Sequence, residues 1–437
     1  MTGTPSEMIE EAGDARPQLE AATHPAQRRT VTVLSLTTVL GGLGTGASLS
    51  AGALLIADIT GNPALSGFGS TMNAVGAAIA GIPLARLAAR RGRRIALASG
   101  NLLAVLGAIL VIGAAYAEIS VLLFLGLAVL GFAVAVQLQA RFAAADLASP
   151  ARRARDLSLV VWSITIGAVI GPNLIGPGEA IGRALGLHQL SGIFLFAIAA
   201  QIAAALVVWF GLRPDPLIES RRIAAETEIE ARAAAARRGD AGPSSPSPAL
   251  AAHGRTAQVL AILVVALGHA IMVGLMAMTP LHLTHHGGSI ELVGITISLH
   301  IAGMYALSPL AGLAAGRWGP VPVVLGGFGV LTLAALGTAV AGDAVWLVQT
   351  SLVLLGLGWC MVTVAGAALI TTVTPPEDRP ARQGQADTAM NGAGALFGAA
   401  SGLLFAAGGF PVLSSVAGAL IVVGIAAAVR LGALTRR

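Results

Sequence analysis

The sequence has no lysine and one cysteine, and charged residues make up only 11% of its 437 residues. Without lysine there is no Gly-x-x-x-x-Gly-Lys loop to cradle nucleotide phosphates, so we do not expect ATP to be the energy source. The single Cys360 excludes a disulfide framework and any Cys-x-x-Cys metal or redox motif. No nucleophile stands with a base in a catalytic pattern. We therefore expect neither an enzyme nor a bound cofactor.

What the sequence does contain is apolar residues, which make up 55% of the chain. They form runs of about 20 residues separated by short polar breaks, the length that a bilayer-spanning helix needs. The alternation of apolar and polar residues typical of a membrane barrel is missing. We therefore predict an all-α membrane protein with spans at 31–57, 64–85, 95–115, 119–142, 157–177, 190–212, 257–281, 290–314, 321–341, 345–373, 386–407 and 411–431.

The placement of positive charge predicts the orientation. All 26 basic residues are arginine, and if both termini are cytoplasmic, every one except Arg183 falls on or near the cytoplasmic side. The net charge of +5 thus reflects membrane topology and does not indicate nucleic acid binding. Residues 1–27 are polar and acidic, unlike a cleavable signal peptide. We expect a multi-pass protein of the cytoplasmic membrane that acts as a monomer.

One long polar insert divides the chain. Residues 218–238 are rich in Glu, Ala and Arg and predict a surface helix, and 239–248 form a Gly/Ser/Pro linker. The predicted parts are a cytoplasmic arm, a six-helix bundle, a cytoplasmic linker, a second six-helix bundle and a tail, at 1–30, 31–212, 213–256, 257–431 and 432–437.

An internal repeat supports two related bundles. The sequence Pro-Leu-Ala-Arg-Leu-Ala-Ala at 83–89 recurs 226 residues later as Pro-Leu-Ala-Gly-Leu-Ala-Ala at 309–315. Both copies close the second helix of their half and continue into an Arg/Gly turn. Two repeated halves joined by a cytoplasmic loop are typical of a secondary transporter whose halves rock about a central site.

The turn after the second helix resembles the signature loop of the major facilitator superfamily, Gly-x-Leu-Ala-Asp-Arg-x-Gly-Arg-Arg. That resemblance extends over the chain through helix number and loop lengths, and it implies twelve helices and alternating access. The Asp of the pattern is Ala89 here and Gly316 in the second copy, so this loop lacks the acid of the family's charge relay at both positions.

The basic half of the pattern is kept. Asp146 and Asp156 are the nearest acids that could pair with it. The alternative is simple anchoring by positive charge on the cytoplasmic side. We predict a gating loop of Arg90, Arg93, Arg94 and Asp146.

Two motifs on neighbouring spans point to a soft metal. Met272 and Met276 form Met-x-x-x-Met, and His300 and Met304 form His-x-x-x-Met. Residues four apart lie roughly 40° apart around a helix, so each pair shares one face. A short turn makes the two spans antiparallel, and their middles lie at similar depth. Thioether and imidazole ligands suit Cu(I) and release it more readily than thiolates would.

The same two motifs are similar to the signature of the CcoA-like copper importers, the CalT branch of the superfamily. That resemblance implies that these four residues bind copper as the transported substrate. The alternative is methionine as flexible core filling. Further soft or titratable groups are a possible accessory set, His269, Cys360 and Met361, and a loop cluster that could collect copper outside the membrane, His282, His285 and His286.

Two other functions compete with copper uptake. A proton-coupled exporter of drugs or small apolar metabolites is favoured by the glycine-proline run at 167–177. It is disfavoured because no carboxylate is expected at mid-membrane, where a proton carrier needs one; Asp58 and Asp387 come closest. A membrane scaffold or sensor is disfavoured by the half-repeat.

Overall fold

The computed structural model describes residues 24–61, 65, 68–238, 248–285 and 290–435, and these residues form helices and no strands. The first half of the chain begins with α2 (Gln27–Thr60) and continues through α3 (Phe68–Arg91), α4 (Arg93–Ala117), α5 (Ser120–Leu130), α6 (Phe132–Ala143), α7 (Arg153–Ile170), η2 (Gly171–Leu174), α8 (Ile175–Ala184), η3 (Gln189–Ser191) and α9 (Ile193–Gly211).

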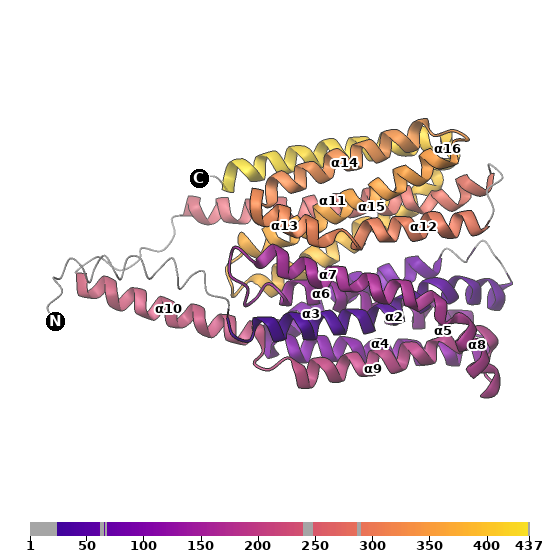
Figure 1. The fold of residues 1–437 in the computed structure, drawn as a ribbon, viewed down its shortest axis with the longest axis horizontal. Coiled ribbons are helices and arrows are strands. Elements are labelled where there is room, and N and C mark those ends of the chain that lie inside the picture. The colour runs from indigo at the N-terminus through magenta and orange to yellow at the C-terminus, as the bar shows by residue number, and fades with distance from the viewer. Residues whose placement is uncertain (1–23, 62–64, 66–67, 239–247, 286–289, 436–437) are drawn as a thin grey trace.

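The linker helix α10 (Pro216–Arg238) projects from one end of the bundle (Figure 1). The second half contains α11 (Pro248–His285), α12 (Ile290–Tyr305), α13 (Ser308–Trp318), α14 (Pro320–Val340), α15 (Val345–Thr372) and α16 (Arg379–Thr435).

These helices account for the predicted twelve-span fold, although several spans are divided or merged. The fourth span is α5 followed by α6, and the eighth is α12 followed by α13. The last two spans lie in α16, which turns back at Gly408 and Gly409. Gly409 has a φ of 66°, a left-handed conformation that glycine adopts without steric cost. By length and composition, nine helical stretches of the described residues could each cross a membrane.

The two halves lie side by side, the first in indigo and magenta and the second in orange and yellow (Figure 1). Within the second half, α11 packs chiefly on α16, and α14 packs on α15. The first half is organised around α2, which packs on α7 and α9. A smaller apolar cluster joins the halves: Phe142, Leu157, Val161, Ala311, Cys360, Val364 and Ala367.

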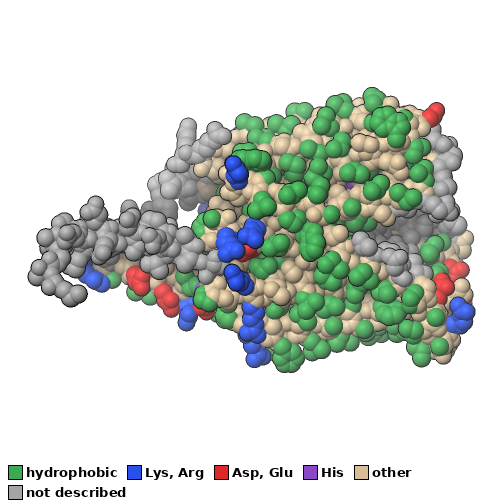
Figure 2. Space-filling model, in the orientation of Figure 1, with side chains coloured by type: hydrophobic (Ala, Val, Ile, Leu, Met, Phe, Trp, Pro, Cys, Tyr) green, Lys and Arg blue, Asp and Glu red, His purple; other side chains and the backbone are tan. Residues whose placement is uncertain are grey.

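The surface matches a bilayer. Apolar side chains cover the flank of the bundle, and arginines gather at the end from which α10 leaves it (Figure 2). Leu396 and Leu403 of α16 are 76% and 78% exposed. Such exposure is costly in water but not against lipid tails.

The halves are joined by hydrogen bonds that cluster toward the α10 end. Thr388 Oγ1 donates to the carbonyl of Ala78 over 3.0 Å, and Ser308 Oγ donates to the carbonyl of Ser158 over 3.1 Å. Close backbone packing accompanies them: a Cβ on Gly384 of α16 would lie 2.9 Å from the Gly81 oxygen of α3. The halves are therefore closed against each other at this end.

Candidate functional site

A buried ion pair crosses the interface between the halves. The Nη2 atom of Arg141 in α6 lies 2.9 Å from the Oδ1 atom of Asp387 in α16. Arg141 is 2% exposed and Asp387 is fully buried. Within the described part of the chain, Asp387 Oδ2 and Arg141 Nε are buried without a hydrogen-bond partner. The pair thus joins the halves through one contact and leaves one acceptor and one donor unsatisfied.

Asp387 is one of the two acids that the sequence places closest to mid-membrane, and the structure buries it between the two halves of the bundle. The span predicted from the sequence starts at 386. The helix in fact begins at Arg379, so Asp387 lies about two turns inside it. Its backbone oxygen accepts a hydrogen bond from the side-chain Nδ2 of Asn391, one turn farther along the helix, over 2.8 Å. The signal that could have found it is the Pro375-Pro376 pair, after which a new helix starts readily.

Aromatic side chains from three helices gather near this pair. Trp359 Nε1 of α15 donates to His269 Nδ1 of α11 over 2.9 Å. Tyr305 of α12 meets the Trp359 ring edge-on, with 5.6 Å between ring centroids. His269 therefore has Nδ1 as an acceptor and is positioned by the indole. Arg141 Nη2 lies 3.9 Å from the sulfur of Met390, which packs in the same core cluster as Trp359.

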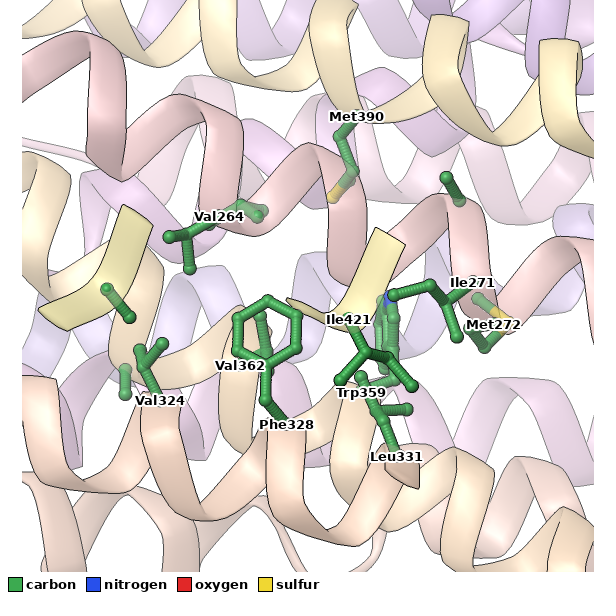
Figure 3. Packing of buried hydrophobic residues seen from close by; sticks show 14 of the residues in the cluster. Val264, Ile271, Met272, Val324, Phe328, Leu331, Trp359, Val362, Met390 and Ile421 are labelled. Atoms are coloured by element: carbon green, nitrogen blue, oxygen red, sulfur yellow. The ribbon is translucent and has the colours of Figure 1, made fainter. Parts of the chain in front are cut away.

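The predicted metal ligands of α11 lie in packed surroundings. Met272 is buried in the core of the second half beside Ile271 and close to Trp359 (Figure 3). Met276 is partly buried and packs against the same cluster. Met304 of α12 belongs to that cluster as well. The three thioethers thus share one apolar core, in which α11 and α12 each contact α15 more than they contact each other.

His300 is fully buried, and its two nitrogens differ. Nδ1 lies 2.7 Å from the carbonyl oxygen of Leu352 in α15. Because that oxygen only accepts, Nδ1 carries the proton in the neutral ring, and Nε2 is left with a lone pair. Nε2 is buried and has no hydrogen-bond partner in the described residues. An imidazole held in this way through its other nitrogen is typical of a metal ligand.

The other predicted soft groups are spread over several elements. Cys360 is buried in the cluster that joins the halves, and Met361 is partly buried against it. His282 is buried, with Nε2 2.9 Å from the Gly342 oxygen and its ring 4.7 Å from that of Phe410. The His285 side chain and the whole of His286 lie outside the described residues.

The predicted gating loop contains a second buried ion pair. Arg93 Nε lies 2.9 Å from Asp146 Oδ2, and another Arg93 nitrogen donates to Gln383 of the opposite half. The backbone N–H of Arg94 donates to Asp215 over 2.8 Å, whereas Arg90 is exposed.

Two further polar groups complete the closed end. Asp156 accepts a hydrogen bond from Gln27 Nε2 over 2.7 Å rather than from the loop arginines. Burial and the neighbouring Arg379 lower the pKa of Arg153 to about 10, so this guanidinium remains charged at neutral pH. It donates to Thr372 Oγ1 over 3.3 Å and so links α7 to the end of α15.

The family is decided by sequence comparison. The profile of the Major Facilitator Superfamily matches residues 34–289 and again residues 259–436. The chain belongs to this superfamily. Its members include the MFS-type transporter YddS of Bacillus subtilis, which is 36% identical over 90% of this chain and 88% of its own length. The chain is therefore a membrane transporter and not an enzyme.

A more distant relative and two solved structures extend the comparison. The riboflavin transporter RfnT of Brucella anthropi is 25% identical over 89% of this chain and 92% of its own. The proton:xylose symporter XylE shares the fold, with a TM-score of 0.70 at 14% identity over 90% and 94% of the two chains. The human organic anion transporter MFSD10 has a TM-score of 0.68 at 18% identity over 93% and 100%. These structures establish the superfamily fold alone.

Proposed function

We propose that this chain is a proton-coupled secondary transporter of small organic molecules in the cytoplasmic membrane, with Asp387 as the group that carries the proton. The observation on which the proposal rests is the buried Arg141–Asp387 pair between the halves. A titratable group inside a membrane is costly to keep and marks a proton or substrate path in transporters. This pair supplies the carboxylate whose expected absence had counted against a proton-coupled carrier.

The pair also links protonation to movement. While Asp387 is ionised, its attraction to Arg141 holds α16 of one half to α6 of the other. When Asp387 binds a proton, the site keeps one positive charge and loses that attraction. Protonation thus changes the relative stability of the closed and open arrangements, which is what coupling in an alternating-access carrier requires.

The test uses right-side-out membrane vesicles loaded with a pH-sensitive dye and challenged with riboflavin and a panel of small aromatic compounds. We expect at least one compound to change the internal pH when the intact protein is present. Asp387→Asn should abolish this proton movement. Asp378→Asn, which alters an exposed acid in the turn before the same helix, should leave it intact. Proton movement that survives Asp387→Asn would remove Asp387 from the mechanism.

Copper uptake is the second candidate, and the unpartnered Nε2 of His300 supports it. Together with the thioethers of Met272, Met276 and Met304 it makes a neutral, soft ligand set of the kind that binds Cu(I). The accessory groups His269, Cys360 and Met361 and the loop histidines belong to this candidate too.

Cellular copper in a strain lacking the gene tests this candidate. Copper import predicts a lower content that is restored by the intact gene and by Met278→Ala but not by Met272→Ala or His300→Ala. Met278 is the matched control because it lies on the same helix, about 120° around the axis from Met272, and is not one of the predicted ligands. Unchanged copper content in the deletion strain would dismiss copper as the substrate.

A further inference from the structure

Arg141 is underused as a hydrogen-bond donor. A guanidinium presents its N–H groups as a planar fork that fits both oxygens of a carboxylate. In this structure one Nη2 contact at 2.9 Å reaches Asp387 Oδ1, while Arg141 Nε and Asp387 Oδ2 remain without partners in the described residues. Buried donors and acceptors are costly to leave unsatisfied. Arg141 Nε is therefore a buried donor from which a second carboxylate could accept a hydrogen bond.

The side chains around Arg141 favour a ligand that contains an aromatic ring. Its guanidinium carbon lies 4.9 Å from the centroid of the Phe142 ring. Phe142 shares an apolar cluster with Tyr305, and Tyr305 in turn packs edge-on against Trp359. Rings in such a cluster contact another ring favourably, through edge-to-face or offset stacking. A ring bearing one carboxylate would use both the guanidinium and these aromatic faces.

The charges of the site allow an anionic ligand to replace Asp387 as the ionic partner of Arg141. In the structure Arg141 and Asp387 neutralise each other. If an anionic ligand takes over the guanidinium, Asp387 becomes an uncompensated buried carboxylate, unless it binds one proton. The site with ligand and proton then has the same net charge as the empty site. Besides this pair, the titratable groups that interact with it from the packed helices are Arg93 of α4, His269 of α11 and Tyr305 of α12.

We infer that the transported compound is a small aromatic carboxylate that replaces Asp387 as the partner of Arg141. This inference rests on the proposed proton-coupled function and names its substrate class. The carboxylate of Asp387 gains one proton as the ligand carboxylate binds Arg141, and it loses that proton when the ligand leaves. One anion and one proton therefore move together, without net charge transfer.

The experiment compares each acid with its own uncharged amide. The probes are benzoate and benzamide, nicotinate and nicotinamide, and indole-3-acetate and indole-3-acetamide, with binding to the purified full-length protein measured calorimetrically. We expect at least one acid to bind roughly ten- to a hundredfold more tightly than its amide, the difference that a charged hydrogen bond makes. Binding of that acid should weaken as pH rises, because fewer Asp387 carboxyls then accept the proton.

Two variants test the role of each partner. Arg141→Gln alone would leave Asp387 buried without a counter-charge, so the variant used is Arg141→Gln/Asp387→Asn, which carries no charge at the site. It should bind acid and amide equally. Asp387→Asn alone should bind the acid with little dependence on pH. Arg183→Gln, at the opposite end of the first half, should behave as the intact protein.

Three outcomes would overturn this substrate class: amides that bind as tightly as their acids, acid preference that survives in the double variant, or no binding by any of the six probes. None of these outcomes bears on whether proton movement in vesicles depends on Asp387. The substrate class and the proton-coupled function are therefore tested independently.

Discussion

At the scale of single residues, the Arg141–Asp387 pair shows how burial changes the contribution of an ion pair to stability. On a surface such a pair contributes little to stability, because water screens it. Here both side chains are removed from solvent, and each compensates the desolvation of the other. The same reasoning applies to Arg93 and Asp146 at the α10 end, whose side chains are fully buried.

Replacing one member of the pair is therefore expected to lower the stability of the fold more than replacing both. Arg141→Met or Asp387→Leu should each lower the free energy of unfolding by about 3–5 kcal/mol, because each leaves a lone buried charge. The double variant Arg141→Met/Asp387→Leu should lose much less. Thermal and denaturant unfolding of the three variants in detergent measures this double-mutant cycle. Single losses that simply add in the double variant would show that the two charges do not interact.

At the scale of helices, α3 and α16 close the α10 end through small residues. A Cβ on Gly384 would lie 2.3 Å from the Cβ of Ala85, closer than real side chains approach. A hydroxyl beside this contact, that of Thr388, binds the backbone of Ala78. Position 384 thus requires glycine because α16 and α3, from different halves, approach each other closely there, and not because the chain turns.

Gly384→Ala should separate the halves at this end. Spin labels at Arg91→Cys and Asp378→Cys, both exposed positions, would report the distance between α3 and the start of α16 in a Cys360→Ser background. We expect a longer distance in Gly384→Ala than in the parent. Gly402→Ala is the control, because a Cβ there meets open space on the same helix. Equal distances in the two variants would contradict a steric role for Gly384.

At the scale of the whole molecule, the arginines at the α10 end orient the bundle in the membrane. Arginine near a span resists translocation, so the end that carries most of it faces the cytoplasm. The figures place α10 and the arginine-rich surface at the same end of the bundle (Figures 1 and 2). We therefore expect the closed end to be the cytoplasmic one.

Cysteine labelling in intact cells checks this orientation. Tyr116 at the end of α4 is 75% exposed, and Arg232 lies on exposed α10. In a Cys360→Ser background, a membrane-impermeant maleimide should label Tyr116→Cys from outside. It should label Arg232→Cys only after the cells are opened. The reverse pattern would invert the topology and the direction of every step proposed above.

The sequence by itself determined the twelve-span architecture, the half-repeat and the superfamily. Span length, charge placement and loop motifs are local properties, and the bilayer imposes them on each segment separately. One helix end within that architecture differs, because α16 begins at Arg379 whereas the predicted eleventh span begins at 386, so Asp387 lies deeper in its helix than predicted. The predicted break between the last two spans, 386–407 and 411–431, coincides with the turn at Gly408 and Gly409.

Only the tertiary structure decided which polar groups meet. Arg141 and Asp387 are 246 residues apart, and His300 and its acceptor Leu352 are 52 apart. No periodicity connects such pairs, because they depend on how helices of different position rotate and pack against one another. The direction of each buried side chain, and with it the choice between a coordinating group and a packed one, follows from that packing and not from spacing along the chain.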